Sequence, residues 1–421
     1  MFKIGMQRTT TRPTKCRGQL EKKLFSLVLC LVCVFFTVSI ILMNRVETTL
    51  TIHQTHHHPW THNSHNNDNA NGLHNSSHHG SSNTMRKNEL ITTPVTSKQK
   101  QKEYSNDDKP WWLHDKDRLV AALESQNINI SEISEQTWSQ VPTWTKITEL
   151  YGSKPIVIGL DQCSTFRDAV PENERIITPA GLFNTGTNLI ASLLEFNCHF
   201  PNRRPPKKRL ESNGVTWQTP WGKHSPPEFR NQTVDDPFFK TMNKDYVLPV
   251  VAIREPYEWM ISTCHNNYVL RWPHRRRCPN LVHPNGTLIE VYNQYFHGDI
   301  RRYHKSLAHF WNDWNRQYTD PHPGFPRLMV RHKDLIFYPK ETIQMVCECA
   351  GGELIHKNNN FTYIINAAKG NRKGAKPFDG LVGNWIKYGK EFDISQIPRE
   401  DVEVAKNVLD ETIMEMFDFK W

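Results

Sequence analysis

A short glycine-bounded loop is the stretch of this 421-residue chain best suited to hold an anion. It runs from Gly181 to Asn188, between a β-branched run and an apolar segment with helical spacing. A strand, a tight glycine loop and a helix start direct backbone N–H groups and the positive end of a helix dipole at one point. Phosphate or sulfate is the occupant that this arrangement favours, although a plain glycine turn would leave the same pattern.

The residues after the second glycine argue against an ordinary ATPase or GTPase site. Gly181 and Gly186 have the spacing of a nucleotide-triphosphate loop, but that loop continues with a lysine for the phosphates and a Ser or Thr for Mg²⁺. Here the corresponding residues are Thr187 and Asn188, so we predict a metal-free site, and a kinase is the weaker alternative. The residues predicted to hold the phosphate-like group are Asn184, Thr185, Gly186, Thr187 and Asn188.

A second pair of residues is suited to a phosphate monoester. Arg254 follows the apolar run 246–253, and Ser262 stands in a segment that Pro256 can start as a helix. Arginine offers a forked cationic donor and serine a hydroxyl, and ligands of open parallel sheets bind at the carboxyl ends of strands. The alternative is structural: Arg254 pairs with Glu258, and Ser262 caps a turn.

A third stretch carries groups suited to proton transfer. His224 belongs to the residue type whose ordinary pKa lies nearest neutrality, so it could take a proton from an attacking hydroxyl. Lys223, directly before it, could offset negative charge that develops during a reaction. A loop histidine beside a surface lysine is the plainer interpretation. If His224 lacks the catalytic role, His199 and His265 are the next candidates.

These residues are predicted to be positioned by one α/β sheet. Four runs are apolar on both faces, which is typical of parallel strands covered on both sides, and segments with helical spacing alternate with them. The predicted fold class is therefore α/β, a central parallel sheet flanked by helices. The predicted strands are 155–159, 175–180, 246–253 and 328–331, and the predicted helices are 189–196, 258–270, 303–318 and 340–350.

The first part of the chain differs in composition from the rest. Residues 24–43 carry no charge and are long enough to span a bilayer, and seven Lys or Arg precede them against one acid. The positive-inside rule then makes 1–23 a cytosolic basic tail and 109–421 a luminal domain. A cleaved signal peptide is disfavoured because the run is long and no small-residue cleavage site follows closely. The His- and Asn-rich, low-complexity segment 44–108 is predicted to be a disordered stem.

The cysteines fit an oxidising lumen. Six of the nine lie in the predicted luminal part, and neither their spacing nor that of the histidines indicates a metal site. Cys264 and Cys278 flank one basic loop and form the predicted bridge, although six cysteines allow fifteen pairings. N-x-S/T sequons, weak support for a luminal location, occur at Asn75, Asn129, Asn231, Asn285 and Asn360.

The formal net charge of +9 favours anionic partners. Basic clusters occur at 203–209, 275–277 and 301–302. Most such runs are solvated surface, and a luminal domain is not expected to bind nucleic acid. A cluster beside an acceptor groove would suit an anionic glycan.

Together these stretches resemble the sulfotransferase superfamily, whose members use 3′-phosphoadenosine 5′-phosphosulfate. Residues 185–188 look like its 5′-phosphosulfate loop, and Arg254 with Ser262 matches its 3′-phosphate motif. The stretch 221–226, which holds Lys223 and His224, is similar to the segment that carries the base in cytosolic members. Residues 330–351 look like the late strand, loop and helix of the family. The segment that resembles the C-terminal nucleotide clasp contains Arg372, Lys373 and Gly374, with 383–385 after a longer gap.

The resemblance implies a P-loop-like sulfotransferase fold and a Golgi membrane protein of single-pass type II topology, held by one N-terminal helix. It implies sulfuryl transfer from 3′-phosphoadenosine 5′-phosphosulfate, a donor co-substrate, to an acceptor hydroxyl without a metal. A glycan or glycoprotein is the favoured acceptor. A tyrosylprotein sulfotransferase and a catalytically silent, glycan-binding relative remain as alternatives.

Two positions depart from the family pattern. Asn184 stands where the family has a Lys or Arg that assists the departing phosphate, and Leu189 stands where cytosolic members often have a Trp against the adenine. Lys223 is the predicted substitute for the missing cation, and adenine contact must come from elsewhere.

Overall fold

The structure, a computed structural model, describes most of the chain after residue 109. The described residues are 110–203, 211–273, 277–295, 301–320, 324–355, 361–366 and 380–420, with no statement on the side chains of 211 and 212. They belong to the second of two compact units, Pro94–Trp421; the first, Met1–Thr93, lies outside them. The predicted tail, membrane anchor and stem therefore also fall outside. Within the described ranges, no helix has the length and apolarity needed to cross a membrane.

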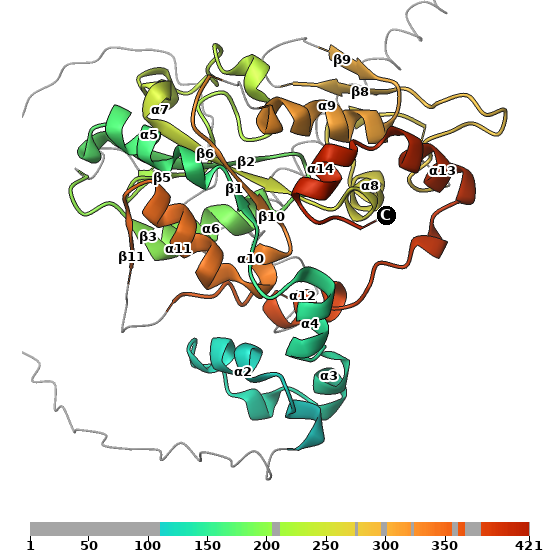
Figure 1. The fold of residues 1–421 in the computed structure, drawn as a ribbon, viewed down its shortest axis with the longest axis horizontal. Helices are drawn as coiled ribbons and strands as arrows, with labels where there is room; N and C mark the ends of the chain where they lie inside the picture. Colours follow the sequence, from blue (N-terminus) through green and yellow to red (C-terminus); the bar gives the residue numbers. More distant parts are fainter. Residues whose placement is uncertain are drawn as a thin grey trace, which may run out of the picture. The chain divides into compact units, whose positions relative to one another are not determined.

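A six-stranded, mostly parallel sheet with helices on both faces forms the centre of a mixed α/β fold (Figure 1). Its strand order is β1-β10-β6-β2-β5-β4. The parallel strands are β2 (Ile176–Gly181), β5 (Val215–Thr216), β6 (Val247–Ile253) and β10 (Leu328–Arg331). Every residue of β2, β6 and β10 is buried, as expected for strands covered on both sides. The predicted strands 175–180, 246–253 and 328–331 are confirmed.

Both edge strands depart from the predicted parallel order. β1 (Val157–Ile158) pairs antiparallel with β10, and β4 (Glu211–Ser212) pairs antiparallel with β5. β1 is also shorter than the predicted strand 155–159, because Gly159 adopts a left-handed φ of 94° and the chain enters a 3-10 turn. A side chain at Gly159 would collide with the Arg327 carbonyl, so glycine is required there.

The two faces of the sheet are covered by different helices (Figure 1). Alternate residues of β6 enter different apolar clusters: Val251 and Ile253 on one side, Val250 and Ala252 on the other. The first cluster includes α8 (Pro256–His265), α9 (Leu307–Thr319), α13 (Arg399–Val408) and α14 (Glu411–Met416). The second includes α5 (Cys163–Ala169), α6 (Thr187–Asn197) and α11 (Pro339–Cys349).

Two predicted helices have different boundaries because a second sheet begins where they were expected to continue. α8 ends at His265 instead of residue 270, and Tyr268 has a left-handed φ of 50°. α9 begins at Leu307 instead of residue 303, capped by Ser306. The unpredicted antiparallel sheet consists of β7 (Leu270–Arg271), β8 (Val291–Gln294) and β9 (Arg301–His304).

Further helices pack beside α10 (Asp334–Phe337), beyond the end of β10. They share an apolar cluster that contains Trp138, Phe337 and Trp385. The helices of this cluster are α2 (Asp117–Glu124), α3 (Glu135–Gln140), α4 (Trp144–Tyr151) and α12 (Leu381–Tyr388). The remaining short elements are α7 (Pro237–Lys240) and the pair β3 (Cys198–His199) with β11 (Glu353–Leu354).

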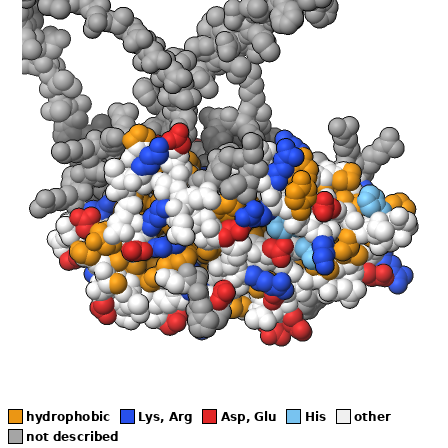
Figure 2. All heavy atoms as spheres, turned by 90° about the horizontal axis from the view of Figure 1, so that it is seen from above, with side chains coloured by type: hydrophobic (Ala, Val, Ile, Leu, Met, Phe, Trp, Pro, Cys, Tyr) orange, Lys and Arg blue, Asp and Glu red, His pale blue; other side chains and the backbone are white. Residues whose placement is uncertain are grey.

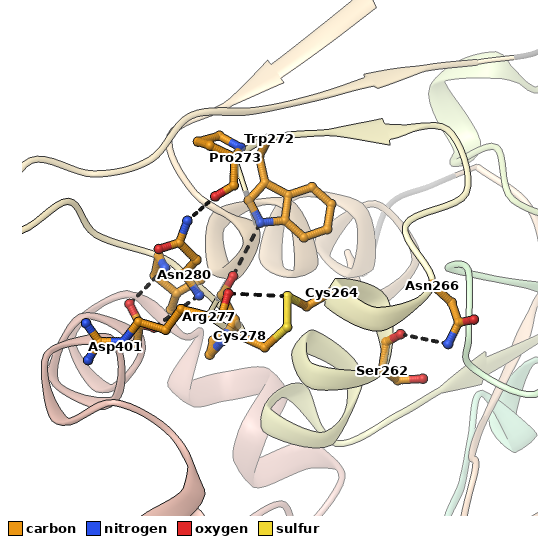
Figure 3. Close-up of a disulfide and its surroundings, with 11 residues drawn as sticks. Ser262, Cys264, Asn266, Trp272, Pro273, Arg277, Cys278, Asn280 and Asp401 are labelled. Atoms are coloured by element: carbon orange, nitrogen blue, oxygen red, sulfur yellow. Dashed lines mark hydrogen bonds between the residues drawn. A yellow bond between two sulfur atoms is a disulfide. The ribbon is translucent and has the colours of Figure 1, made fainter. Parts of the chain in front are cut away.

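Three disulfides stabilise this fold. Cys163–Cys349 and Cys198–Cys347 join α5 and β3 to the end of α11. Cys264–Cys278 closes the loop that follows α8 (Figure 3), which confirms the predicted bridge. A disulfide of this kind contributes typically about 2–4 kcal/mol to the free energy of unfolding. Three of them are consistent with a secreted or luminal protein.

Candidate functional site

The predicted anion loop connects β2 to α6. Gly186 is the N-cap of α6, an eleven-residue helix, and has a left-handed φ of 88°. A Cβ on Gly186 would lie 2.6 Å from Cδ2 of His332, and one on Gly181 would lie 2.7 Å from the Ala252 carbonyl oxygen. Both positions therefore need glycine, and the loop presents the positive end of the α6 dipole.

His224 lies directly against the first glycine of this loop. Its Nδ1 is 2.8 Å from the Gly181 carbonyl oxygen, and the Gly181 N–H donates to the Lys223 carbonyl at 2.8 Å. A carbonyl oxygen can only accept, so Nδ1 carries a hydrogen, and in the neutral ring the lone pair is on Nε2. This tautomer is the one that a general base acting through Nε2 requires.

Lys223 reaches the other end of the same loop. Its Nζ donates to Oδ1 of Asn188 at 2.8 Å, in the first turn of α6, and lies 5.4 Å from the centre of the Trp217 ring. A lysine from a different segment thus places its charge beside a loop that lacks one of its own. The structure therefore brings together Lys223, His224 and the predicted loop residues.

Asn184 links the loop to the second predicted anion motif. Its Nδ2 donates to the Asn266 carbonyl at 3.0 Å and to Oγ1 of Thr263 at 3.3 Å, both from α8 or its C-cap. Its own carbonyl accepts from Nη1 of Arg254 at 3.1 Å. The φ of 62° at Asn184 is left-handed, a conformation that asparagine tolerates better than most residues. The side chain predicted to hold the ligand is thus engaged with α8.

Arg254 makes the structural ion pair with Glu258 that the sequence allowed, and it also contacts the anion loop. It is 5 % exposed, and its Nε lies 3.6 Å from Oε2 of Glu258, the predicted ion pair. Its Nη1 is bound to the loop, and its guanidinium lies 5.4 Å from the centre of the Tyr388 ring. Across the described part of the chain, Nε of Arg254 and Oε2 of Glu258 have no hydrogen-bond partner. These buried polar atoms are a polar spot that a ligand or water can complete.

Ser262 is half-buried on α8, two turns beyond Arg254. Its carbonyl accepts from the N–H of Asn266 and, at 3.4 Å, from Nδ2 of the same residue (Figure 3). Asn266 in turn accepts from Asn184, so Ser262 belongs to the α8 segment that contacts the loop. The N-cap of α8 is Glu255, not Ser262.

His332 is a site residue that the sequence did not single out. It follows β10, donates its backbone N–H to the Ile253 carbonyl, and packs its ring against Gly186. The residue is 7 % exposed, and its Nδ1 has no hydrogen-bond partner among the described residues. Burial, and then the positive charges of Arg254, Lys333 and Lys387, hold the pKa of His332 well below its ordinary value. A neutral imidazole therefore lies beside the α6 N-cap.

Lys333 completes the charges behind the loop. Its Nζ lies 2.7 Å from Oε1 of Glu258, which also faces Arg254. Burial lowers the pKa of Lys333, but the carboxylate of Glu258, with Tyr151 and Glu255, outweighs burial, so the net shift is upward. The 330–335 pattern was visible in the sequence, but nothing local shows that it folds against Gly186.

Glu255 makes the stability of this region depend on pH. It caps α8 by accepting from the N–H groups of Tyr257 and Glu258, and burial, then the charge of Glu258, raises its pKa from 4.5 to about 7. Between these values the folded state binds a proton that the unfolded state releases, so the free energy of unfolding falls as pH rises. We expect Glu255→Gln to flatten this fall, measured by urea unfolding from pH 4.5 to 7.5. The exposed Glu290→Gln is the control, and an unchanged slope in Glu255→Gln would contradict the assignment.

Three tryptophans hold the backbone of the site. The indole N–H of Trp259 donates to the Phe183 carbonyl at 2.7 Å, and that of Trp311 to the Arg254 carbonyl at 3.1 Å. Trp314 donates to the His224 carbonyl at 3.0 Å. All three are at most 1 % exposed. Since a buried indole N–H requires an acceptor, these bonds fix the loop, the end of β6 and the base segment on one helical layer.

An apolar pocket lies one turn beyond the anion loop, bordering Leu189. Apart from Asn384, its lining is mostly apolar, and a Tyr ring forms one wall. Burial raises the pKa of that tyrosine, Tyr363. The lining includes Leu189, Leu193, Tyr363, Ile364, Leu381 and Asn384.

No protein-family model, curated protein or solved structure matches this chain. What the site does is therefore inferred from its own residues. Of the predicted site residues, Arg372, Lys373 and Gly374 lie outside the described part of the chain.

Proposed function

We propose that this protein is a sulfotransferase that moves a sulfuryl group from 3′-phosphoadenosine 5′-phosphosulfate to an acceptor hydroxyl, with a glycan as the favoured acceptor. The observation that carries the proposal is that Lys223 and His224, two consecutive residues, contact opposite ends of the anion loop. His224 contacts Gly181 at the start of the loop, and Lys223 contacts Asn188 at its end. A base and a cation thus flank the place where an anion fits best.

The donor side has three parts that suit the three parts of this nucleotide. The α6 N-terminus with Lys223 suits the phosphosulfate. Arg254, whose Nε faces Glu258 but has no hydrogen-bond partner in the described structure, suits the 3′-phosphate together with Ser262. The small pocket lined by Leu189, Tyr363 and Asn384 is the proposed place for the adenine, in place of the tryptophan that the family usually has; its volume is about 10 Å³, so its lining must part to admit the base.

The proposed reaction is an in-line displacement at sulfur. The acceptor oxygen forms a bond to sulfur while the bond from sulfur to the phosphate oxygen breaks, and adenosine 3′,5′-bisphosphate leaves. Nε2 of His224 takes the hydroxyl proton. Lys223 and the N–H groups at the start of α6 offset the charge that develops on the leaving phosphate.

Two other assignments compete with this proposal. Protein tyrosine would replace the glycan hydroxyl as acceptor, and a silent relative would bind glycans without transfer. The apolar uncharged run at 24–43 and the disulfides motivate a Golgi location with type II topology, which we also propose. Incubating the full-length chain with ³⁵S-labelled donor and separate glycan and tyrosine-peptide acceptors distinguishes these possibilities. Label on the peptide alone moves the assignment to tyrosine, and label on neither supports the silent relative.

Donor recognition gives a prediction that does not depend on turnover. We expect adenosine 3′,5′-bisphosphate to bind without Mg²⁺ and Arg254→Ala to weaken it about ten- to a hundred-fold, since hydrogen bonds to charged groups contribute roughly 1.5–3 kcal/mol. Calorimetry on the full-length chain measures both, with the exposed Arg399→Ala as the matched control. Arg254→Lys, which keeps the charge, should recover part of the affinity. Mg²⁺-dependent ATP binding with no response to the bisphosphate would reject the donor assignment.

A further inference from the structure

The three-stranded sheet has a solvent-facing side that the proposed reaction leaves unused. Directly paired residues lie on the same side of a sheet, and the register pairs Arg271 with Tyr292 and Tyr292 with Tyr303. Arg301 precedes Tyr303 by two residues and faces the same way. Arg271, Arg301 and Tyr303 are exposed, whereas Val291 on the opposite side is buried. Arg271, Tyr292, Arg301 and Tyr303 form what we name the aromatic–basic face.

Rings and guanidinium groups alternate on the aromatic–basic face. The rings of Tyr292 and Tyr303 are 5.5 Å apart, and the guanidinium carbon of Arg301 lies 5.8 Å from the centre of the Tyr292 ring. Tyr303 is 56 % exposed. In the described ranges, Arg271 and Arg301 form no ion pair with a carboxylate, unlike Arg302, which pairs with Glu228. Two cationic donors thus stand beside two tyrosine rings.

This face is continuous with the candidate base. Nη1 of Arg271 donates to the Tyr268 carbonyl at 3.3 Å. The ring of Tyr268, 43 % exposed, stacks on Phe183 at 5.4 Å and 17°, and the Phe183 ring lies 4.6 Å from that of His224. Ring contacts therefore link Tyr268, beside the three-stranded sheet, to His224 through Phe183, which is buried.

The loop between Cys264 and Cys278, which carries Arg271, is held in position near both ends. The disulfide Cys264–Cys278 closes it, and Trp272 donates its indole N–H across the base of the loop to the Pro279 carbonyl (Figure 3). Asn184 of the anion loop donates to its Asn266 carbonyl. A ligand that contacts Arg271 would therefore lose little binding energy to ordering residues 266–272.

We propose that the aromatic–basic face binds an anionic polysaccharide, one that already carries sulfate or carboxylate groups, and directs it toward His224. The apolar C–H faces of sugar rings can pack on the tyrosine rings, and guanidinium groups bind sulfate or carboxylate through paired hydrogen bonds. The orientation of the bound polysaccharide toward His224 rests on the proposed function, whereas its binding to the aromatic–basic face does not. Figure 2, which looks onto the side of the molecule where β8 and β9 lie in Figure 1, shows Lys and Arg beside hydrophobic side chains, with Asp and Glu among them.

Binding without any donor tests this proposal. The probe is a chondroitin sulfate hexasaccharide, titrated against the full-length chain at about 0.1 M salt and then at higher salt. We expect Arg271→Gln with Arg301→Gln to weaken binding about tenfold or more, and Tyr303→Ala about three- to fivefold. The control, Lys146→Gln with Lys340→Gln, removes the same charge from α4 and α11, and it should bind like the wild type.

Each of the other binding results would either overturn or support the proposed role of this face. An equal loss in the control pair, or no loss in the arginine pair, would overturn the proposal. Equal affinity for neutral maltohexaose would overturn its anionic character, and tighter, variant-sensitive binding of a polyglutamate peptide would replace the polysaccharide by an acidic protein. Because no transfer is measured, hexasaccharide binding that depends on Arg271 and Arg301 would support this face even if the sulfotransferase assignment fails.

Discussion

Replacement of His224 by alanine is expected to lower turnover by about 10²–10⁴-fold and to leave the affinity for adenosine 3′,5′-bisphosphate nearly unchanged. The reason is the bond of Nδ1 to the Gly181 carbonyl, which leaves the lone pair on Nε2. Initial rates with saturating donor, combined with calorimetry, separate the two effects.

His199 and His265 supply the matched controls. His199 places Nδ1 3.2 Å from the Glu353 carbonyl in the β3–β11 pair, and His265 is exposed in the last turn of α8. Alanine at either position should leave turnover within a few-fold of wild type. Wild-type turnover in His224→Ala, with a large loss in one of these variants, would transfer the role of base to that residue.

Lys223→Ala is expected to reduce turnover by about 10²–10³-fold, a larger effect than on donor affinity. The charge that Lys223 offsets appears mainly in the transition state, so its removal affects the chemical step more than binding. Rates measured for Lys223→Ala, Asn188→Ala and the double variant form a cycle. Because Nζ of Lys223 is held by Oδ1 of Asn188, the two losses should not add.

Additive losses would show that Asn188 does not position Lys223, and a harmless Lys223→Ala would show that another group supplies the cation. Asn184→Lys, which introduces the cation usual in the sulfotransferase superfamily, is a demanding rescue of Lys223→Ala. Position 184 has a left-handed φ, and its present side chain donates to the Asn266 carbonyl. The substitution removes the amide that makes this bond, so any gain of charge comes with the loss of that contact.

The parts of the fold that could be predicted are those encoded within a few consecutive residues. The buried run 247–253 and the glycine loop each carry their signal locally, and both are present as predicted. The β7–β9 sheet could not be predicted, because Leu270–Arg271 is two residues long and its pairing with Val291–Gln294 crosses a disulfide-closed loop. The antiparallel direction of β1 was missed for a similar reason, since direction is set by pairing partners and not by composition, and the two-residue β4 was not predicted at all.

The residues of the candidate site likewise fall into those that can be recognised in the sequence and those that only folding brings together. The spacing of Arg254 and Ser262 can be seen in the sequence, whereas the contact of His332 with Gly186 joins two segments that lie far apart in the chain. The tryptophan bonds to the backbone also depend on tertiary packing. Trp259, Trp311 and Trp314 look like ordinary core residues until their N–H partners are known.

Under the proposed function, the contacts of Asn184 bear on which nucleotides fit. Its carbonyl accepts from Arg254 and its amide donates to the end of α8, so one residue joins the two candidate anion sites. The separation of these sites would then be set by the protein. Isomers with equal charge, such as adenosine 2′,5′-bisphosphate and its 3′,5′ counterpart, present their phosphates at different separations. We therefore expect the proposed site to select by the spacing of two charges and not by total charge alone.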